Sequence, residues 1–233
     1  MQKLKQKLTE NGLFQAAKRY KNDGFSIIPV NAGSSHNVKS AATTWKPFQK
    51  RQPTLAEITH WFSESNPDIG IGIVCGRVSQ LIVLDLDDDA NATFRDFNHG
   101  MADLLQTYTV RTPGRKGLHI YWRVNFPVAS KKVRGGDLQA EGKYVVAPPT
   151  IINGQPYQPI NDLPIKTLQP QELRQILDFL SVLPQPDCSL PQPNNKTRSM
   201  TTNEQSLSDF YYHISHKAGR NNGLFAAARK ARN

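Results

Sequence analysis

Apolar side chains recur along this chain at two spacings, one that suits helices and one that suits strands. Spacings of three and four residues predict helices over residues 12–22, 90–106 and 170–183, and a short helix after Pro53. Shorter apolar runs, bounded by turn-forming or acidic residues, predict strands. These runs cover residues 25–30, 69–75, 80–86, 108–112, 118–124 and 143–147. Many strands with interspersed helices predict an α+β, or mixed α/β, fold.

Capping and turn signals give further detail on where the predicted helices, strands and loops begin and end. Thr54 and Glu57 form a capping-box pattern at the start of the short helix. Asn153-Gly154, between two apolar positions, is a strong hairpin signal. Residues 31–52 follow neither spacing and are predicted to form a loop.

The C-terminal part of the chain differs in composition from the rest. Four prolines between residues 184 and 193, followed by a polar run, predict a linker over 184–202. Residues 203–233 are basic and have helical character. We therefore expect one domain over residues 1–183, then the linker, then a C-terminal helical extension.

The chain of 233 residues has a net charge of +10, and the charges are unevenly placed. Residues 1–21 and 196–233 carry the whole excess of positive charge. Residues 52–106 hold nine acidic and two basic side chains, whereas residues 107–146 hold eight basic and two acidic ones. An acidic stretch beside a basic stretch suits metal ions and phosphates respectively, although solvated faces of mixed charge would give the same pattern.

Composition also excludes several classes of protein. With only two cysteines, neither a disulfide framework nor a four-cysteine zinc site can form. No apolar run approaches the roughly 20 residues needed to cross a bilayer. The basic N-terminus is not followed by the apolar stretch of a secretory signal. The sequence thus predicts a soluble, cytoplasmic protein with no membrane partner.

The most informative segment is the apolar run 80–86, which leads directly into acidic residues. Residues two apart on a strand share one face and lie about 6.6 Å apart, so Asp85 and Asp87 are expected to project together. Two carboxylates so close repel unless a cation lies between them, and hard divalent ions prefer oxygen ligands. An exposed acidic turn is the simpler alternative. A calcium loop is a third, but Ala90 stands where that loop requires glycine.

A second segment, residues 112–121, combines a basic glycine turn with a following strand. Backbone N–H groups at Gly117, together with Arg115 and Lys116, could cradle a polyphosphate. His119 and Tyr121 are expected to face one way on the strand. A single histidine on a strand is, however, more often structural than catalytic.

A third segment, residues 134–149, places Asp137 in a glycine-rich approach to a strand. There it could complete a site of three carboxylates with Asp85 and Asp87. By itself Asp137 would be interpreted as a turn residue, because Gly-Asp is common in turns.

Taken in order, the three segments resemble the primase-polymerase (prim-pol) branch of the archaeo-eukaryotic primase superfamily. The resemblance rests on Asp85-x-Asp87 at a strand end, Gly117-x-His119 on a strand, and Asp137 before the run 144–149. The flanks agree and extend the resemblance over about residues 12–158. They are the opening strand 24–30, the Trp-Lys-Pro loop 45–49 and the strand 69–76. Residues 216–224 resemble the start of a primase C-terminal helical module.

The resemblance implies a catalytic core in which an α/β unit faces a unit like the RNA-recognition motif. It implies that Asp85, Asp87 and Asp137 bind two divalent ions, Mg²⁺ or Mn²⁺. His119 would lie in the nucleotide site, beside Arg115, Lys116 and Gly117. Relatives with a cysteine-rich zinc element differ from this chain, so primer extension is better supported than primer initiation.

The predicted function is template-directed nucleotidyl transfer by a DNA primase, a DNA polymerase or both. Its partners would be single-stranded or primed DNA, nucleoside triphosphates, and a helicase or further C-terminal domain, in a prokaryotic cell, plasmid, phage or mobile element. Two alternatives use the same residues: a metal-dependent nuclease, and a DNA-binding replication module without activity. Candidate contacts to DNA phosphates are Arg111, Arg123, Lys131, Lys132 and Arg134.

Overall fold

The computed structural model describes residues 2–33, 37–63, 68–87, 90–114 and 117–181. All of them belong to a unit formed by residues 1–185. The predicted linker over 184–202 and the predicted extension over 203–233 lie outside the described residues. The described part is α+β, as the sequence predicts.

Most helices lie close to their predicted positions. They are α1 (Gln2–Asn22), η1 (Lys46–Gln49), α2 (Leu55–Phe62), α3 (Ala90–Met101), η2 (Ala102–Leu105) and α4 (Pro170–Ser181), with η1 and η2 being 3₁₀ helices. Helix η1 lies within residues 31–52, where a loop was predicted, because a single 3₁₀ turn is too short to show helical spacing. The capping box of Thr54 and Glu57 is present at the start of α2. Helix α1 begins well before residue 12, because Leu4 and Leu8 are four residues apart and the lysines and glutamines around them favour helix. No described helix combines the length and apolar character needed to span a membrane.

Two antiparallel sheets form the centre of the unit. Sheet A has the strand order β1-β2-β8, and sheet B has the order β11-β4-β5-β3-β7-β6. The strands are β1 (Ser26–Asn31), β2 (Ile69–Val74), β3 (Leu81–Leu86), β4 (Thr109–Arg111), β5 (Leu118–Arg123), β6 (Lys131–Val133), β7 (Gly136–Gln139), β8 (Tyr144–Ala147), β9 (Ile151–Ile152), β10 (Gln155–Pro156) and β11 (Gln158–Pro159). Strands β9 and β10 form the hairpin that Asn153-Gly154 predicts. Strands β6 and β7 were not predicted.

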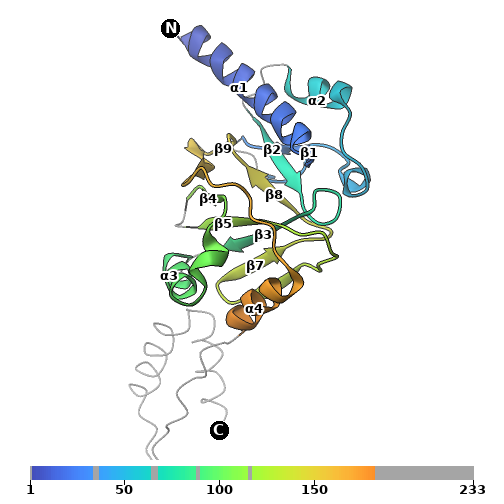
Figure 1. Ribbon diagram of the computed structural model, residues 1–233. Coiled ribbons are helices and arrows are strands. Elements are labelled where there is room, and N and C mark those ends of the chain that lie inside the picture. The colour runs from blue at the N-terminus through green and yellow to red at the C-terminus, as the bar shows by residue number, and fades with distance from the viewer. Residues whose placement is uncertain (1, 34–36, 64–67, 88–89, 115–116, 182–233) are drawn as a thin grey trace, which may run out of the picture. The chain divides into compact units, whose positions relative to one another are not determined.

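Strand β3 alternates between two hydrophobic cores. Leu81 and Val83 belong to a core shared with sheet A and with helices α1 and α2. Ile82, Leu84 and Leu86 belong to a second core shared with α3, η2 and α4. Sheet B therefore has α1, α2 and sheet A on one side and α3 and α4 on the other (Figure 1). Asp85 continues the alternation on the side that faces sheet A.

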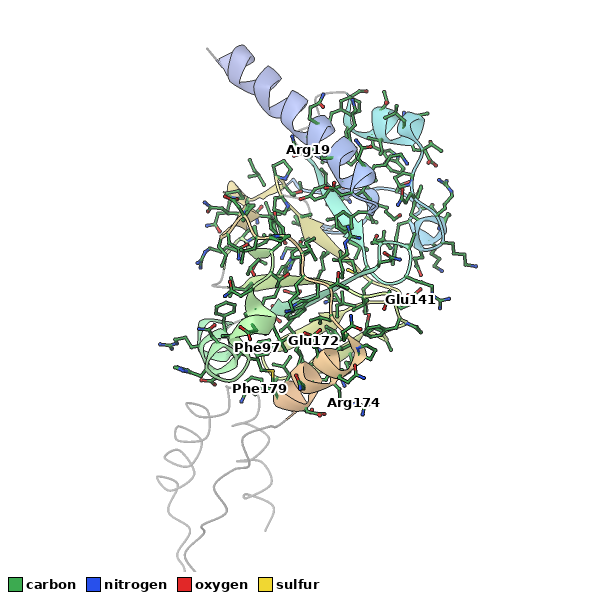
Figure 2. The ribbon with its side chains drawn as sticks, in the orientation of Figure 1. Arg19, Phe97, Glu141, Glu172, Arg174 and Phe179 are labelled. Atoms are coloured by element: carbon green, nitrogen blue, oxygen red, sulfur yellow. The ribbon has the colours of Figure 1, made fainter. Side chains whose placement is uncertain are left out.

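Aromatic side chains tie the second core together. The rings of Phe97 on α3 and Phe179 on α4 stack with centroids 5.3 Å apart (Figure 2). Trp122 on β5 lies edge-on to Phe97 and donates a hydrogen bond of 2.7 Å to the backbone oxygen of Leu104. Both helices are thereby held against sheet B beneath β3 and β5, the strands that carry Asp85 and His119.

Candidate active site

Four polar side chains lie in a row across sheet B. In the strand register, His119 on β5 is opposite Asp85 on β3, Asp85 is opposite Asp137 on β7, and Asp137 is opposite Lys132 on β6. Directly opposed residues share a face of a sheet. The transverse row, as we call these four residues, therefore lies on the face toward sheet A. Three segments that are far apart in the sequence meet in it.

Glycines allow β7 to approach β3 closely enough to form this row. A Cβ atom on Gly136 would lie 1.8 Å from the backbone oxygen of Asp85, so no other residue fits there without moving a strand. Gly135 has a φ of 78°, in the left-handed region that glycine adopts readily. Asp137 follows directly and comes to lie opposite Asp85.

The central contact of the row joins His119 and Asp85. The Nε2 atom of the buried imidazole lies 3.2 Å from Oδ1 of Asp85, which is partly exposed. Burial raises the pKa of the Asp85 carboxyl, but the hydrogen bond and charge of His119, with contributions from Lys39 and Gln139, outweigh it. The pKa of Asp85 consequently lies below its ordinary value, and its carboxylate is ionised at neutral pH.

Two tyrosine rings pack against the imidazole of His119. The ring centroids of Tyr157 and Tyr121 lie 5.6 and 6.2 Å from that of the imidazole. Burial, followed by the charge of Asp85, raises the pKa of Tyr157. Within the described part of the chain, Nδ1 of His119 and the hydroxyl of Tyr121 are buried without a hydrogen-bond partner. The imidazole is thus held by ring packing and by its contact with Asp85.

Asp137 and Asp87 lie beside the central pair. Oδ2 of Asp137 is 3.7 Å from the ammonium of Lys132, which is almost fully exposed. Asp87 follows the end of β3, and its backbone N–H donates a 2.9 Å hydrogen bond to the oxygen of Gly135. Across the described residues, no three histidine, cysteine, aspartate or glutamate side chains gather closely enough to hold a metal ion. Asp85 and Asp137 each face a basic side chain instead.

The basic glycine turn begins next to the end of β3. Residues 115–116, which include both predicted phosphate contacts of the turn, lie outside the described residues. At its ends, Gly114 donates its N–H to the side-chain oxygen of Gln155 at 2.6 Å. A Cβ atom on Gly117 would lie 2.4 Å from Oγ1 of Thr112 and 3.0 Å from the backbone oxygen of Leu86. Gly117, at the end of the turn, therefore lies against Leu86, the residue that follows Asp85 on β3.

The five predicted DNA contacts fall into two groups. Arg111, Lys131 and Lys132 are exposed on strands of sheet B. The guanidinium of Arg123 donates to the backbone oxygens of Asp23, at 2.6 Å, and Ser79, at 2.5 Å.

Arg123 also lies 4.0 Å from the ring centroid of Phe25. Arg134 lies over the ring of Phe179 and 3.8 Å from Asp96. The contacts of these two arginines lie within the fold.

The structure adds three residues to the surroundings of Asp85 that the sequence did not suggest. Gln139 and Lys39 both lower the pKa of the Asp85 carboxyl, and the ring of Tyr157 lies against His119, the partner of Asp85. Gln139 could have been found from strand alternation, since it lies two residues after Asp137, had β7 been recognised. Tyr157 follows the predicted hairpin but has no chemical signature of its own.

Comparison with known families identifies the group to which this fold and site belong. A family model described as "Bifunctional DNA primase/polymerase, N-terminal" matches residues 17–173, which include the whole transverse row. The chain is therefore a member of the primase-polymerase (Prim-Pol) family, as the sequence predicts. A comparison with curated proteins finds no match. Family membership supports a DNA primase or polymerase type of activity, which acts on a DNA template and nucleotides and depends on divalent metal ions.

Proposed function

We propose that this chain catalyses template-directed nucleotidyl transfer, joining nucleoside triphosphates to a DNA primer or to a first nucleotide. The observation that carries the proposal is the register of β5, β3 and β7, which sets Asp85 opposite Asp137 and beside His119. Family membership supports the same class of reaction. A buried histidine paired with a partly exposed acid, next to a second acid, is unusual for a merely structural sheet face, because desolvating charge without a function is costly.

The acids of the site suit hard divalent ions. Asp85, Asp87 and Asp137 offer only carboxylate oxygens, the donors that Mg²⁺ and Mn²⁺ prefer. We assign the binding of two such ions to these three residues, whose side chains would have to turn toward one another, because in the structure they do not gather closely enough to hold an ion. Bound ions would activate the attacking 3′-hydroxyl and neutralise the pyrophosphate leaving group.

The chain's own residues would position the substrate. The ionised Asp85 is available as an acceptor at neutral pH. We place His119 at the triphosphate as well, where Asp85 and Tyr157 hold the imidazole in one orientation. Arg115, Lys116 and Gly117 would bind the β- and γ-phosphates from the turn beside β3.

For DNA, the exposed side chains are the better candidates. We assign the binding of primer and template phosphates to Arg111, Lys131 and Lys132. Such contacts would bind DNA of any sequence, and their affinity would fall as the salt concentration rises. Arg123 and Arg134 make contacts within the fold, so their replacement would act first on stability. A helicase or further domain would act through the C-terminal part of the chain.

A primer-extension assay, run beside a primer-free assay on single-stranded DNA, tests this function. We expect incorporation by the wild type in the presence of Mg²⁺ or Mn²⁺, and a loss of roughly a hundredfold or more in Asp85→Asn. Asp103→Asn, which replaces an exposed acid on η2, is the matched control and should retain activity. Degradation of labelled DNA without nucleoside triphosphates would instead indicate a nuclease. Binding of DNA that ignores both metal and triphosphates would indicate a module without activity.

A further inference from the structure

Arg134 lies in the turn of the β6–β7 hairpin, the element that brings Asp137 into the transverse row. Strand β6 ends at Val133 and β7 begins at Gly136, so Arg134 and Gly135 form the whole turn. The sequence predicts a contact to DNA phosphates for Arg134, yet its Nε and Nη2 atoms are buried, without a hydrogen-bond partner among the described residues. The guanidinium therefore belongs to the interior of the fold.

Two helices hold Arg134 in place. Its backbone N–H donates a 3.0 Å hydrogen bond to the backbone oxygen of Leu180, in the last turn of α4. The centre of its guanidinium lies 4.9 Å from the ring centroid of Phe179 in the same turn, and its Nη2 atom is 3.8 Å from Oδ2 of Asp96 on α3. A cation over an aromatic face and beside the end of a helix is favourable. Arg134 thus joins the hairpin turn to both helices.

All three predicted metal-binding acids adjoin this turn. The backbone oxygen of Gly135 accepts a 2.9 Å hydrogen bond from the N–H of Asp87. Gly136 lies so close to the backbone oxygen of Asp85 that a Cβ atom would be 1.8 Å from it. Asp137 follows on β7, opposite Asp85. A shift of the turn would therefore move Asp87 and Asp137 relative to Asp85.

We propose that Arg134 positions these acids for metal binding by fixing the turn of the β6–β7 hairpin against α3 and α4. The assignment rests on the proposed function, which gives the acids to divalent ions. The guanidinium packs with α3 and α4, on the side of sheet B away from the transverse row. It therefore acts through the turn and touches neither the ions nor DNA. Groups that orient metal ligands in this way typically change metal affinity tenfold or more when they are replaced.

Binding of Mn²⁺ alone, followed by electron paramagnetic resonance of the free ion, tests the assignment. Arg134→Met removes the charge, and we expect it to weaken Mn²⁺ binding roughly tenfold. Arg134→Lys keeps a cation over the ring of Phe179 and should retain most of the affinity. Arg51→Met is the matched control, because Arg51 makes the same two kinds of contact elsewhere, with the ring of Phe48 at 4.6 Å and with Glu57 at 2.7 Å. It should bind Mn²⁺ like the wild type even where it melts lower.

Melting temperatures, and DNA binding in the presence of EDTA, are measured on the same proteins. The assignment is wrong if Arg134→Met binds Mn²⁺ like the wild type, or if Arg51→Met melts equally low and binds Mn²⁺ equally weakly. A loss of DNA affinity in Arg134→Met as large as its loss of Mn²⁺ affinity would make Arg134 a DNA contact instead. If the wild type itself binds no Mn²⁺, the assignment of ions to the acids fails as well, whereas unchanged Arg134 variants leave the proposed function standing.

Asp96→Asn carries the same test if Arg134→Met does not fold, because Asp96 is exposed and its replacement keeps the size of the side chain. We expect it to weaken Mn²⁺ binding roughly threefold, as is typical for the loss of a partly exposed ion pair. Asp103→Asn removes the same charge from η2 and should bind Mn²⁺ like the wild type. Equal affinities in these two variants would contradict the assignment.

Discussion

At the scale of single residues, Asp85 is the point on which the site depends. It has His119 on one neighbouring strand and Asp137 on the other. Its pKa is set by opposing effects, since burial raises it while His119, Lys39 and Gln139 lower it further. A partly buried carboxylate that remains ionised at neutral pH, with a second acid opposite, is prepared to receive a cation.

The lowered pKa of Asp85 predicts how stability depends on pH. A carboxyl whose pKa is lower in the folded than in the unfolded state contributes stability above its unfolded pKa of about 3.9, and loses it as the pH falls through its folded pKa. We therefore expect Asp85→Asn to be less stable than the wild type at pH 7. The difference in free energy of unfolding should shrink as the pH falls from about 4 toward 3. Urea unfolding of both proteins across this range measures it.

Asp103→Asn is the control for this measurement, because Asp103 is exposed and lies on η2, outside the row. Its difference from the wild type should stay small at every pH. A difference between Asp85→Asn and the wild type that is the same at pH 7 and pH 3 would contradict the interpretation, since it would show that charge at Asp85 contributes nothing.

At the scale of elements, the short β6–β7 hairpin completes the row. It supplies Asp137 and Lys132, and it lies at the edge of sheet B next to β3. The hairpin is joined through Gly135, and Gly136 permits the close approach to the backbone of Asp85. The position of Asp137 consequently depends on a residue without a side chain.

Gly136→Ala tests this dependence. The added methyl group would overlap the backbone oxygen of Asp85, so β7 must move away from β3. We expect a loss of about 1–3 kcal/mol in the free energy of unfolding, as is typical of overpacking, and a loss of nucleotide incorporation. Chemical unfolding and primer extension on the same preparations measure both.

Gly100→Ala is the control substitution in the same protein. Gly100 lies in α3, and nothing would meet its Cβ atom within 4 Å. Because alanine favours helix more than glycine does, this variant should be as stable as the wild type or up to about 1 kcal/mol more stable. If Gly136→Ala behaved like Gly100→Ala, β7 would have room that the structure does not show.

The elements also show which parts of the fold could be predicted from the sequence. Strands such as β3 were predictable because their apolar residues are buried on both faces, and α2 because its capping box is local. Strands β6 and β7 were not, because the run 131–137 contains almost no apolar residues: it is an edge hairpin whose polar side chains belong to the site. The position of Lys39 could not be predicted either, because its carbonyl accepts a hydrogen bond from the hydroxyl of Tyr144, which is 105 residues away. The acids themselves were recognised from their order along the chain, and their roles remain a prediction.

At the scale of the whole molecule, the family match and the distribution of charge each mark a boundary along the chain that differs from the boundaries of the folded elements. The family match ends at residue 173, within α4. Beyond it, residues 196–233 carry seven basic and two acidic side chains, and none of the predicted site residues. A positive segment of this kind suits sequence-independent binding of nucleic acid phosphates.

We expect residues 203–233 to be dispensable for extending an existing primer but to contribute to starting a new one. Starting a chain requires two nucleotides to be held on the template without a primer, so additional phosphate contacts matter most there. Comparing residues 1–183 with the full chain in extension and primer-free assays measures both steps, and extension by the shorter chain serves as its own control for folding. Equal initiation by the two proteins would show that the C-terminal part has no such role.

The order of the strands along the chain has a consequence for how the transverse row assembles during synthesis. Asp85 is translated early, but its partners His119 and Asp137 lie on strands that leave the ribosome later, and β7 is the last of the three. A nascent chain therefore presents the first acids without the third until residue 139 has emerged and paired. Incomplete translation products that end before the β6–β7 hairpin would lack Asp137 and Lys132, so they would not contain the complete transverse row.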